Sequence, residues 1–488
     1  MTVTELGQQQ LLIGGDWRAA AEGRTFDTTD PWTGDAAGTA AAATRDDACA
    51  AVNAAAEAFR EWSATTPSAR RELLQKAAGL LMERAPAIAG VVTQETGATF
   101  GWGMFNCQLG ADMLGEAAAL TTAVTGDVIP SDVPGLTAMA IRAPAGVVLA
   151  IAPWNAPVIL ATRAVAAPLA CGNTVILKAS EVSPRTHGEV IKALAEAGMP
   201  PGVVNLITHR PDDAADVVDE MIAHPAVRRV NFTGSTRVGR LVAENAGRHL
   251  KRVLLELGGK APMIVLADAD LDEAVAAANF GAFFHQGQIC MATERIIAER
   301  SVADAFAEQL GERAAALNVG DPRDPETQIG PMVSGTALER VAGLVDEAVE
   351  RGARVVTGGE ADGRCYRPTV LAHVTPEMRI YHEESFGPVV GVMSADSGDE
   401  AVRIANDTEY GLAAAVFGGH VPTALDLARR IESGICHVNG STVHDEPQMP
   451  FGGVKASGFG RFGGRAAIDE FTELRWITVQ EGSRPYPI

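Results

Sequence analysis

The sequence predicts an α/β protein with two doubly wound parallel sheets and a small β arm. From residue 146 onward, apolar segments of strand length alternate with segments of helical periodicity, and this pattern begins again after Gly258-Gly259. Strands that alternate with helices are typical of parallel sheets with right-handed crossovers. At 488 residues the chain is also too long for a single core, so two or three domains are expected.

The composition is that of an ordinary globular protein and argues against several kinds of partner. The chain is 47% hydrophobic and 21% charged, and its net charge of −21 disfavours nucleic acids and anionic membrane surfaces. The first residues lack the pattern of a signal peptide, and prolines interrupt the longest apolar region, residues 146–172. The six cysteines lie far apart, so we expect reduced thiols and a cytoplasmic protein.

The N-terminal quarter predicts a β ribbon followed by helices. Residues 11–43 alternate short apolar runs with turn residues and are expected to lie on a later domain. Residues 45–63 and 68–96 carry apolar residues at helical spacing, and Pro86 is expected to divide the second of these helices. Another helix is predicted over residues 104–124. Such helices usually cover a sheet.

That sheet is predicted from the segment that follows. Strands are expected at residues 147–152, 173–178, 203–207, 229–232 and 251–256, with helices up to 169 and at 184–197, 212–223 and 233–246. Sheets of this kind bind ligands at the carboxyl ends of their strands. We therefore assign residues 1–126 and 146–256 to one dinucleotide-binding domain.

Residues 257–465 predict a second α/β domain, which contains the candidate nucleophile. Its expected strands are at 263–266, 295–299, 355–357, 389–393, 411–417 and 436–438, and its first helices at 271–284 and 302–317. Residues 127–145 and 466–488 are assigned to oligomerisation strands. The strand at 471–480 has no nearby hairpin partner, so pairing with a partner subunit and pairing within its own chain both remain open.

Three polar side chains are candidates for catalysis. Cys290 follows an aromatic segment and a Gly-containing turn, so its thiol is either a nucleophile facing a cleft or a small buried side chain. Glu256 ends an apolar strand and is either a general base or a salt-bridged surface carboxylate. Asn155 follows Pro153-Trp154 and either donates to an oxyanion or forms a turn.

Two strand ends are candidates for binding a dinucleotide. Ser235 begins a helix after Gly234, where free N–H groups and the helix dipole favour a phosphate, although Ser235 could equally be a helix cap. Lys178 and Glu181 could share ribose hydroxyls or form a solvated pair, and an acidic group there would repel a 2′-phosphate.

No other sequence motif indicates a catalytic or cofactor-binding site. The Gly-x-Gly-x-x-Gly match at 458–463 is rejected as a dinucleotide fingerprint, because only 25 residues follow it. The sequence has no zinc-protease helix, nucleophile elbow or P-loop, and we expect no metal.

Six motifs occur in order between residues 11 and 480, and their combination is informative. They are Pro153-Trp154-Asn155, Phe232-Thr233-Gly234-Ser235-Thr236, Glu256-Leu257-Gly258-Gly259-Lys260, Gly287-Gln288-Ile289-Cys290, Glu384-Ser385-Phe386-Gly387-Pro388 and Pro450-Phe451-Gly452-Gly453. In this combination the sequence closely resembles the NAD(P)-dependent aldehyde dehydrogenase family. It departs from the family pattern at Ala179 and Ile289. The resemblance implies an aldehyde dehydrogenase-like fold, a small-molecule aldehyde as substrate, and a homodimer or homotetramer.

The resemblance implies a role for each catalytic candidate. Cys290 would attack the aldehyde to form a thiohemiacetal and then a thioester, while Asn155 would bind the oxyanion. Glu256 would activate the water that hydrolyses the thioester.

The resemblance also implies where the cofactor binds. The expected cofactor is NAD, with NADP less favoured because of Glu181. The adenosine ribose would lie at Lys178 and Glu181, the pyrophosphate at Ser235, and the nicotinamide ribose at Glu384. The expected cofactor contacts are Ala152, Pro153, Trp154, Lys178, Ser180, Glu181, Phe232, Gly234, Ser235, Gly239, Leu257, Gly258, Glu384 and Phe386.

An apolar substrate tunnel is implied along the helix after Asn155. Its expected lining is Ala156, Ile159, Leu160, Arg163, Phe280, Phe284, Ile289, Met291 and Phe451. Flat rings fit such a slot, and Arg163 either bonds a ring substituent or points outward as a structural residue. The segments around Cys290 and near the C-terminus are similar to the branch of salicylaldehyde, benzaldehyde and vanillin dehydrogenases.

We therefore expect NAD⁺-dependent oxidation of an aromatic aldehyde to the carboxylic acid. The alternatives are an aliphatic or semialdehyde dehydrogenase of the same family, a CoA-acylating variant, and a non-catalytic protein that keeps the fold.

Overall fold

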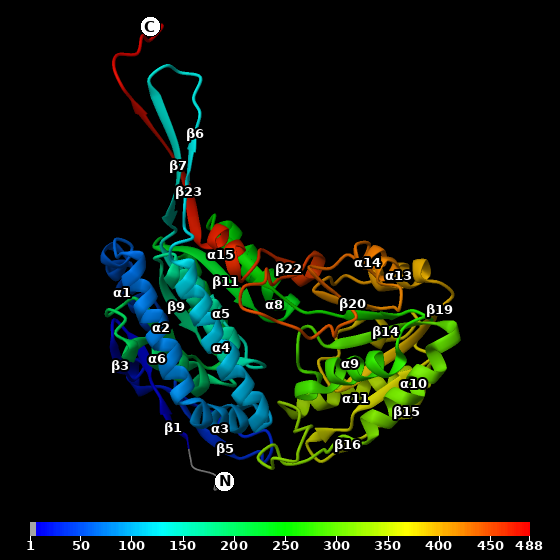
Figure 1. The fold of residues 1–488 in the computed structure, drawn as a ribbon. Coiled ribbons are helices and arrows are strands. Elements are labelled where there is room, and N and C mark those ends of the chain that lie inside the picture. Colours follow the sequence, from blue (N-terminus) through cyan, green and yellow to red (C-terminus); the bar gives the residue numbers. More distant parts are fainter. Residues whose placement is uncertain (1–5) are drawn as a thin grey trace.

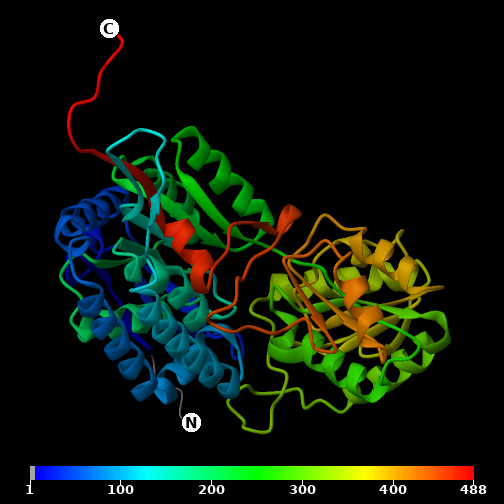
Figure 2. The ribbon, with the colours of Figure 1, turned by 45° about the horizontal axis from the view of Figure 1, so that its top comes forward.

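The computed structural model describes residues 6–488 as two α/β lobes, with a three-stranded arm that projects from the first (Figure 1). Residues 1–5 of the predicted first domain lie outside the described residues. The segment that precedes the C-terminal strand crosses between the two lobes before the chain returns to the arm (Figure 2). No helix within residues 6–488 is long and apolar enough to cross a membrane.

An eight-stranded sheet forms the core of the first lobe, in the order β22-β12-β11-β8-β9-β10-β2-β3. Its strands are β2 (Leu11–Ile13), β3 (Asp16–Arg18), β8 (Val147–Ile151), β9 (Thr174–Lys178), β10 (Val204–Ile207), β11 (Val227–Thr233), β12 (Arg252–Glu256) and β22 (Gly458–Phe459). The strands from β12 to β10 are parallel, and β22 and β2 join them antiparallel. All the residues of β8 and β9 are buried, as expected for strands covered on both faces.

Helices cover both faces of this sheet. They are α1 (Arg45–Trp62), α2 (Pro67–Glu83), α3 (Ala85–Thr96), α4 (Phe100–Leu120), α5 (Pro157–Ala170), α6 (Pro184–Ala197), α7 (Ala214–Ala223) and α8 (Thr236–Arg248). Successive residues of β8 point to opposite faces: Val148 belongs to the core shared with α2 to α6, and Leu149 to the core shared with α1, α7 and α8. The sheet is therefore doubly wound, as predicted.

The N-terminal helices begin and end at recognisable signals. The predicted division at Pro86 is confirmed, because α2 ends at Glu83 and α3 carries this proline in its first turn. The helix predicted over 104–124 begins earlier, at Phe100, because the Thr99 hydroxyl caps it by accepting from the backbone N–H of Trp102.

The predicted β ribbon contributes β2 and β3 to the first sheet. A separate small sheet is formed by β1 (Leu6–Gln9), β5 (Ala36–Ala41) and β4 (Thr25–Thr29).

The second lobe contains a seven-stranded sheet in the order β15-β18-β19-β14-β13-β20-β21. Its strands are β13 (Ala261–Val265), β14 (Thr293–Glu299), β15 (Arg354–Thr357), β18 (Thr369–Ala372), β19 (Val389–Ala395), β20 (Ala413–Phe417) and β21 (Ile435–Val438). Its helices are α9 (Leu271–Phe283), α10 (Arg300–Ala315), α11 (Gly335–Glu350), α12 (Arg379–His382), α13 (Gly398–Asn406) and α14 (Val421–Ala428). All pairs except β15–β18 are parallel, so the second predicted sheet is also confirmed.

The arm consists of β6 (Asp127–Ile129), β7 (Leu136–Pro144) and β23 (Thr472–Gln480). The C-terminal strand pairs antiparallel with β7 of its own chain, from Thr472 opposite Pro144 to Gln480 opposite Leu136. β23 lies at the edge of this sheet, and its other side has no partner strand among residues 6–488.

The structure places two segments differently from the predicted domain boundaries. β22, within the predicted second domain, pairs with β12 of the first sheet, because the chain crosses back between the lobes there. Residues 466–471, predicted as part of an arm strand, belong to helix α15 (Gly464–Phe471). Buried Ile468 and Phe471 of this helix pack into the core of the first lobe. The rest of the division into functional domains stays a prediction.

Asn173 connects helix α5, the residue before β8 and the last residue of helix α15, and its removal is predicted to destabilise the protein. The buried amide accepts from the backbone N–H of Gly146 at 2.9 Å and donates to the carbonyls of Pro168 at 3.0 Å and Phe471 at 2.8 Å. We expect Asn173→Ala to lower the free energy of unfolding by about 2–4 kcal/mol, because several buried groups lose their partners. Thermal unfolding of the variant and the wild type checks this, and Asn53→Ala on the exposed side of α1 is the matched control. Equal unfolding midpoints for Asn173→Ala and the wild type would contradict the prediction.

Candidate active site

The candidate nucleophile follows a strained turn. Cys290 lies between the short 3₁₀ helix η3 (Phe284–Gly287) and β14. His285, Gln286 and Gly287 have positive φ angles of 50°, 55° and 66°. Such angles in residues with a side chain persist only where the surroundings hold them.

Contacts from several segments hold this turn. The buried Gln286 amide donates to the carbonyls of Gly97 at 3.2 Å and Pro331 at 3.1 Å. The His285 ring stacks on Trp102 of α4, with centroids 4.6 Å apart and an interplanar angle of 9°. The position of the nucleophile is therefore fixed from both lobes.

The structure brings Cys290, Glu256 and Asn155 together. Glu256 ends β12, and Asn155 follows β8, so both lie at the carboxyl edge of the first sheet. The Glu256 carboxyl lies close enough to the Cys290 thiol for each group to shift the pKa of the other. The side-chain amide of Asn155 donates to the carbonyl of Gln288 at 2.9 Å, two residues before the cysteine.

Burial dominates the electrostatics of the Cys290–Glu256 pair. It raises the pKa of Glu256 to about 7, against the opposing effects of Arg163 and the Cys290 hydrogen bond. Burial, and then the Glu256 charge, raise the pKa of the Cys290 thiol well above its usual value, while Arg163 lowers it. A carboxyl that titrates near neutral pH is suited to general base catalysis.

Two N–H donors next to Cys290 remain available. The Asn155 amide has two N–H bonds, and the contact with Gln288 uses one of them. Among residues 6–488, no group accepts a hydrogen bond from the backbone N–H of Cys290. Two donors beside a thiol can stabilise negative charge that develops on a carbonyl oxygen.

A cleft of about 550 Å³ lies at the carboxyl ends of β8, β9 and β11. It brings together nine of the predicted cofactor residues, namely Ala152, Pro153, Trp154, Lys178, Ser180, Glu181, Phe232, Gly234 and Ser235. Sequence reasoning missed the opposite wall, where α7 contributes Val218 and α8 contributes Leu241, Asn245 and Arg248. Helical periodicity marks these residues only as surface positions.

Two glycines lie at the start of α8, where this helix meets the cleft. A Cβ atom at Gly234 would lie 2.6 Å from the Phe232 ring, and one at Gly239 would lie 2.4 Å from Leu257. Ser235 caps α8 by accepting from the N–H of Val238 at 3.4 Å. The cap and the anion-binding potential of this helix terminus are compatible, because the remaining N–H groups of the first turn still face the cleft.

A polar cluster lies at one side of the cleft. Lys178 Nζ lies 3.1 Å from Glu181 Oε1, and His209 Nε2 lies 3.4 Å from the same oxygen. Burial opposes ionisation of Glu181, but Lys178 and then His209 bring its pKa below the usual value. An ionised carboxylate is therefore expected at this point of the cleft.

Glu384 and Phe386 lie at the opposite end, next to the nucleophile. The Glu384 carboxylate accepts from the backbone N–H of Gly259 at 2.9 Å, and burial raises its pKa to about 8. The Phe386 ring meets Trp154 edge to face at 5.8 Å. Buried Glu294, which sequence reasoning missed, holds this loop by accepting from the N–H of Ser385 at 2.8 Å.

The chain passes from the first lobe to the second directly beside the nucleophile. A Cβ atom at Gly259 would lie 2.3 Å from the Cys290 carbonyl oxygen, and one at Gly258 would lie 2.8 Å from Glu384 Oε2. The Ser457 hydroxyl donates to the Gly258 carbonyl at 2.6 Å. Only glycine allows this close approach of two backbones.

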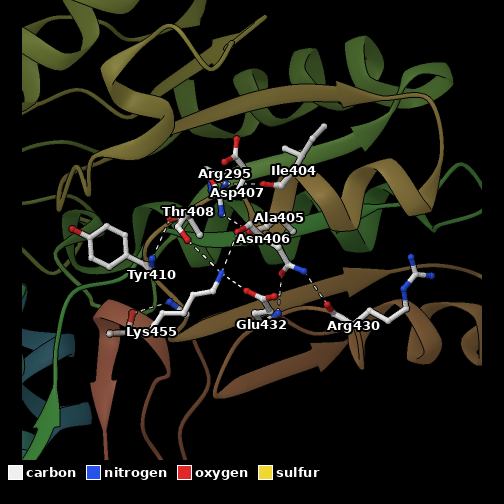
Figure 3. Close-up of polar contacts among 12 residues, drawn as sticks. Arg295, Ile404, Ala405, Asn406, Asp407, Thr408, Tyr410, Arg430, Glu432 and Lys455 are labelled. Atoms are coloured by element: carbon white, nitrogen blue, oxygen red, sulfur yellow. Dashed lines mark hydrogen bonds and ion pairs between the residues drawn. The ribbon is translucent and has the colours of Figure 1, made fainter.

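Polar contacts in the second lobe fix the strand that follows Cys290 (Figure 3). Arg295 of β14 is fully buried and donates to the carbonyls of Ile404 at 3.0 Å and Ala405 at 2.8 Å. Lys455 donates to the carbonyl of Asn406 at 3.1 Å. These contacts connect β14, the end of α13 and the segment that follows Phe451.

The predicted substrate residues gather on the other side of Cys290. Ala156, Ile159, Leu160 and Arg163 are buried on α5, Ile289 and Met291 flank the cysteine, and Phe451 is buried. The Phe280 and Phe284 rings stack with centroids 4.8 Å apart.

Sequence reasoning missed a further aromatic wall from α4. Trp102 contacts Phe284 edge to face at 4.9 Å, and Phe105 contacts the same ring at 6.2 Å. Their separation of more than 150 residues from Cys290 left no local signal. The aromatic cluster near Cys290 is therefore larger than predicted.

Arg163 is not an outward structural residue. Its side chain is buried, forms an ion pair with Asp445, and lies over the Phe451 ring at 4.0 Å from the centroid. Asp445 was not among the predicted residues. In the part of the chain that the structure describes, no group of three or more His, Cys, Asp or Glu side chains is arranged to hold a metal ion.

Comparison with known proteins agrees with this geometry. The family model described as "Aldehyde dehydrogenase family" matches residues 17–477. Vanillin dehydrogenase of Pseudomonas sp. strain HR199 is 57% identical over 478 residues, which cover 98% of this chain and 99% of that protein. The NAD(+) benzaldehyde dehydrogenase of Pseudomonas putida is 43% identical, over 98% of this chain and 97% of that protein.

A solved structure shares the whole fold. The crystal structure of a salicylaldehyde dehydrogenase from Pseudomonas putida G7, complexed with salicylaldehyde, superposes with a TM-score of 0.98. It is 45% identical and covers 99% of this chain and 100% of that chain. The match over nearly the entire length shows that this chain belongs to the aldehyde dehydrogenase family, oxidoreductases that act on aldehydes with NAD(P).

Proposed function

We propose that this chain oxidises aromatic aldehydes to carboxylic acids with NAD⁺, through a covalent intermediate on Cys290. The observation that carries the proposal is the convergence of Cys290, Glu256 and Asn155 beside a cluster of aromatic side chains, near the cofactor cleft. The names of the vanillin, benzaldehyde and salicylaldehyde dehydrogenases that it resembles support the substrate class.

The first step is attack of the Cys290 sulfur on the aldehyde carbon. The thiol proton leaves to the neighbouring Glu256 carboxylate, which then passes it to solvent. As the S–C bond forms, the carbonyl oxygen becomes an oxyanion between the Asn155 amide and the Cys290 backbone N–H. The product of this step is a thiohemiacetal on the enzyme.

The second step releases the acid. Bound NAD(P) supplies the acceptor for the hydride that leaves the thiohemiacetal carbon, and a thioester on Cys290 remains. Ionised Glu256 then takes a proton from water, the resulting hydroxide attacks the thioester carbon, and the C–S bond breaks. The carboxylic acid leaves and the Cys290 thiolate is restored.

The residues of the cofactor cleft fit a dinucleotide. The cleft is long enough to join Glu181 at one end to Trp154 at the other, and the N-terminus of α8 provides free N–H groups between them. Lys178 and Glu181 would hold the adenosine ribose, Ser235 the pyrophosphate, and Glu384 the nicotinamide ribose. Ionised Glu181 favours NAD⁺ over NADP⁺ by repelling a 2′-phosphate.

The arm supports assembly into a homo-oligomer. Leu474 and Trp476 of β23 are 60% and 76% exposed, and Val128 of β6 is 75% exposed. A protruding sheet with exposed apolar side chains and an open edge is a ready site for pairing with another sheet edge. We propose that the arm binds a second copy of this chain.

The substrate class is tested by kcat/KM with NAD⁺ for benzaldehyde, hexanal, succinic semialdehyde and betaine aldehyde. A slot walled by four aromatic rings should favour benzaldehyde over each of the others by at least about tenfold, because stacked rings contribute beyond their buried area. A preference for an aliphatic or charged aldehyde would overturn the proposed substrate class and leave the covalent chemistry in place.

The role of Glu256 is tested by its pH dependence and by Glu256→Gln. A base must be ionised, and a pKa of about 7 means that turnover should rise as pH increases through neutrality and then level off. We expect Glu256→Gln to lose this rise, to lower steady-state turnover by about 100-fold or more, and to stop after a slow burst of at most one NADH per subunit. Wild-type steady-state turnover in this variant would show that another base acts.

The assembly is tested by light scattering of the purified protein. Trp476→Glu should shift the protein to a smaller species, because a charge replaces apolar surface at the proposed contact. Leu250→Glu, at a 94% exposed leucine outside the arm, is the matched control and should leave the mass unchanged. A monomeric wild-type protein, or an unchanged mass for Trp476→Glu, would contradict the proposal.

A further inference from the structure

The ion pair between Arg163 and Asp445 leaves one carboxylate oxygen without a partner. Arg163 contacts Oδ2 of Asp445, and the two side chains are only 7% and 10% exposed. Oδ1 is buried, and among residues 6–488 no group donates a hydrogen bond to it. A buried acceptor with no donor is costly, so such an atom calls for an explanation.

The pair belongs to the space around the nucleophile. Arg163 lies six residues after Pro157, the first residue of α5, and about 9 Å further along the helix axis. Its charge lowers the pKa of Cys290, and the Asp445 charge raises the pKa of Glu256, so both groups lie within electrostatic reach of the reaction centre. The pair therefore lies beyond the first turn of α5, apart from the Asn155 amide that precedes the helix.

The chemistry of Asp445 suits it to accept a hydrogen bond. Burial raises its pKa, while Arg163 opposes that shift by its charge and its hydrogen bond. With Arg163 held against it, the carboxylate is an acceptor only, and its natural partner is a neutral hydroxyl donor. Arg163 itself is occupied by Asp445 and by the Phe451 ring.

We propose that Asp445 determines specificity for ring-hydroxylated benzaldehydes, by accepting a hydrogen bond from the ring hydroxyl at Oδ1. This inference rests on the proposed function, and it names the substrate class more narrowly. With the aldehyde carbon at Cys290 and the ring between the thiol and the ion pair, a hydroxyl at the para position of the ring reaches Asp445. Arg163 acts through Asp445, as a positioning residue that keeps Oδ2 occupied and Oδ1 free.

The structure provides room beside the pair. A cavity of about 30 Å³ is lined by Arg163, Asp445 and Phe451, together with Met113 and Ala117 of α4. This volume accommodates a group of the size of one or two water molecules. A phenolic hydroxyl fits it and supplies the missing donor.

The test compares 4-hydroxybenzaldehyde with 4-fluorobenzaldehyde, whose fluorine is close in size but cannot donate. The ratio of their kcat/KM values is measured in the wild type, in Asp445→Asn and in Glu446→Gln. Glu446 is the adjacent carboxylate and also lines the cavity, but its side chain is 42% exposed and bonded to His444, so it controls for the loss of one charge from the same loop. Comparing the same two substrates in each protein cancels their different intrinsic reactivity.

We expect the ratio to fall at least about tenfold in Asp445→Asn and to stay at the wild-type value in Glu446→Gln. A ratio within about twofold of wild type in Asp445→Asn would overturn the proposal, as would an equal fall in both variants.

A second measurement needs no variant and no turnover. The inhibition constants of 4-hydroxybenzamide and 4-fluorobenzamide are measured on the wild-type enzyme, where the hydroxyl compound should bind at least about tenfold tighter. Equal inhibition would overturn the role of Asp445. Failure of the wild type to oxidise benzaldehyde itself would instead refute the proposed function, so the two failures are distinguishable.

Discussion

The close approach of Gly258 and Gly259 to Cys290 and Glu384 is the constraint on which the rest of the site depends. The chain leaves the first sheet at Glu256 and enters the second at Ala261, and the connection runs against the backbone of the nucleophile. Because neither glycine has a Cβ, the end of β12 and the turn before β14 can lie side by side. The Glu256 carboxyl of one lobe therefore lies near the Cys290 thiol of the other, while the Gly259 N–H donates to Glu384.

Burial then gives this contact its chemistry. Enclosure of Glu256 brings its pKa to about 7, and enclosure of Cys290 raises the pKa of its thiol well above the usual value. Arg163 partly offsets both effects, and Asp445 partly cancels Arg163. The charged groups around the slot thus form one coupled set, in which recognition of the ring and tuning of the reactive pair use the same ion pair.

Much of the fold could be predicted because its signals are local. The alternation of apolar strands and helices fixes both sheets, Pro86 divides a helix, and motif residues mark the strand ends at Lys178, Phe232 and Glu256. The partner of β23 could not be predicted, since polarity alternation alone does not identify the strand on the other side. The same holds for β22, which joins the first sheet after a long excursion through the second lobe.

The same distinction between local sequence signals and distant contacts applies to the candidate site. Cys290, Glu256 and Asn155 could be found because each stands in a short motif, whereas Trp102, Glu294 and Asp445 act through contacts with residues far away in sequence. A buried acidic residue in a loop carries no sequence signal of its burial. Sequence patterns therefore predict the motif residues that the fold brings together better than the distant residues that contact them.

The central claim is that Cys290 carries the acyl group during turnover. The most direct measurement is peptide mass mapping of the enzyme quenched in acid after mixing with NAD⁺ and benzaldehyde. A benzoyl mass increment is expected on the peptide that contains Cys290, and none is expected on the peptides with the other five cysteines. A benzoyl group on another residue, or NADH formation from Cys290→Ala, would contradict it.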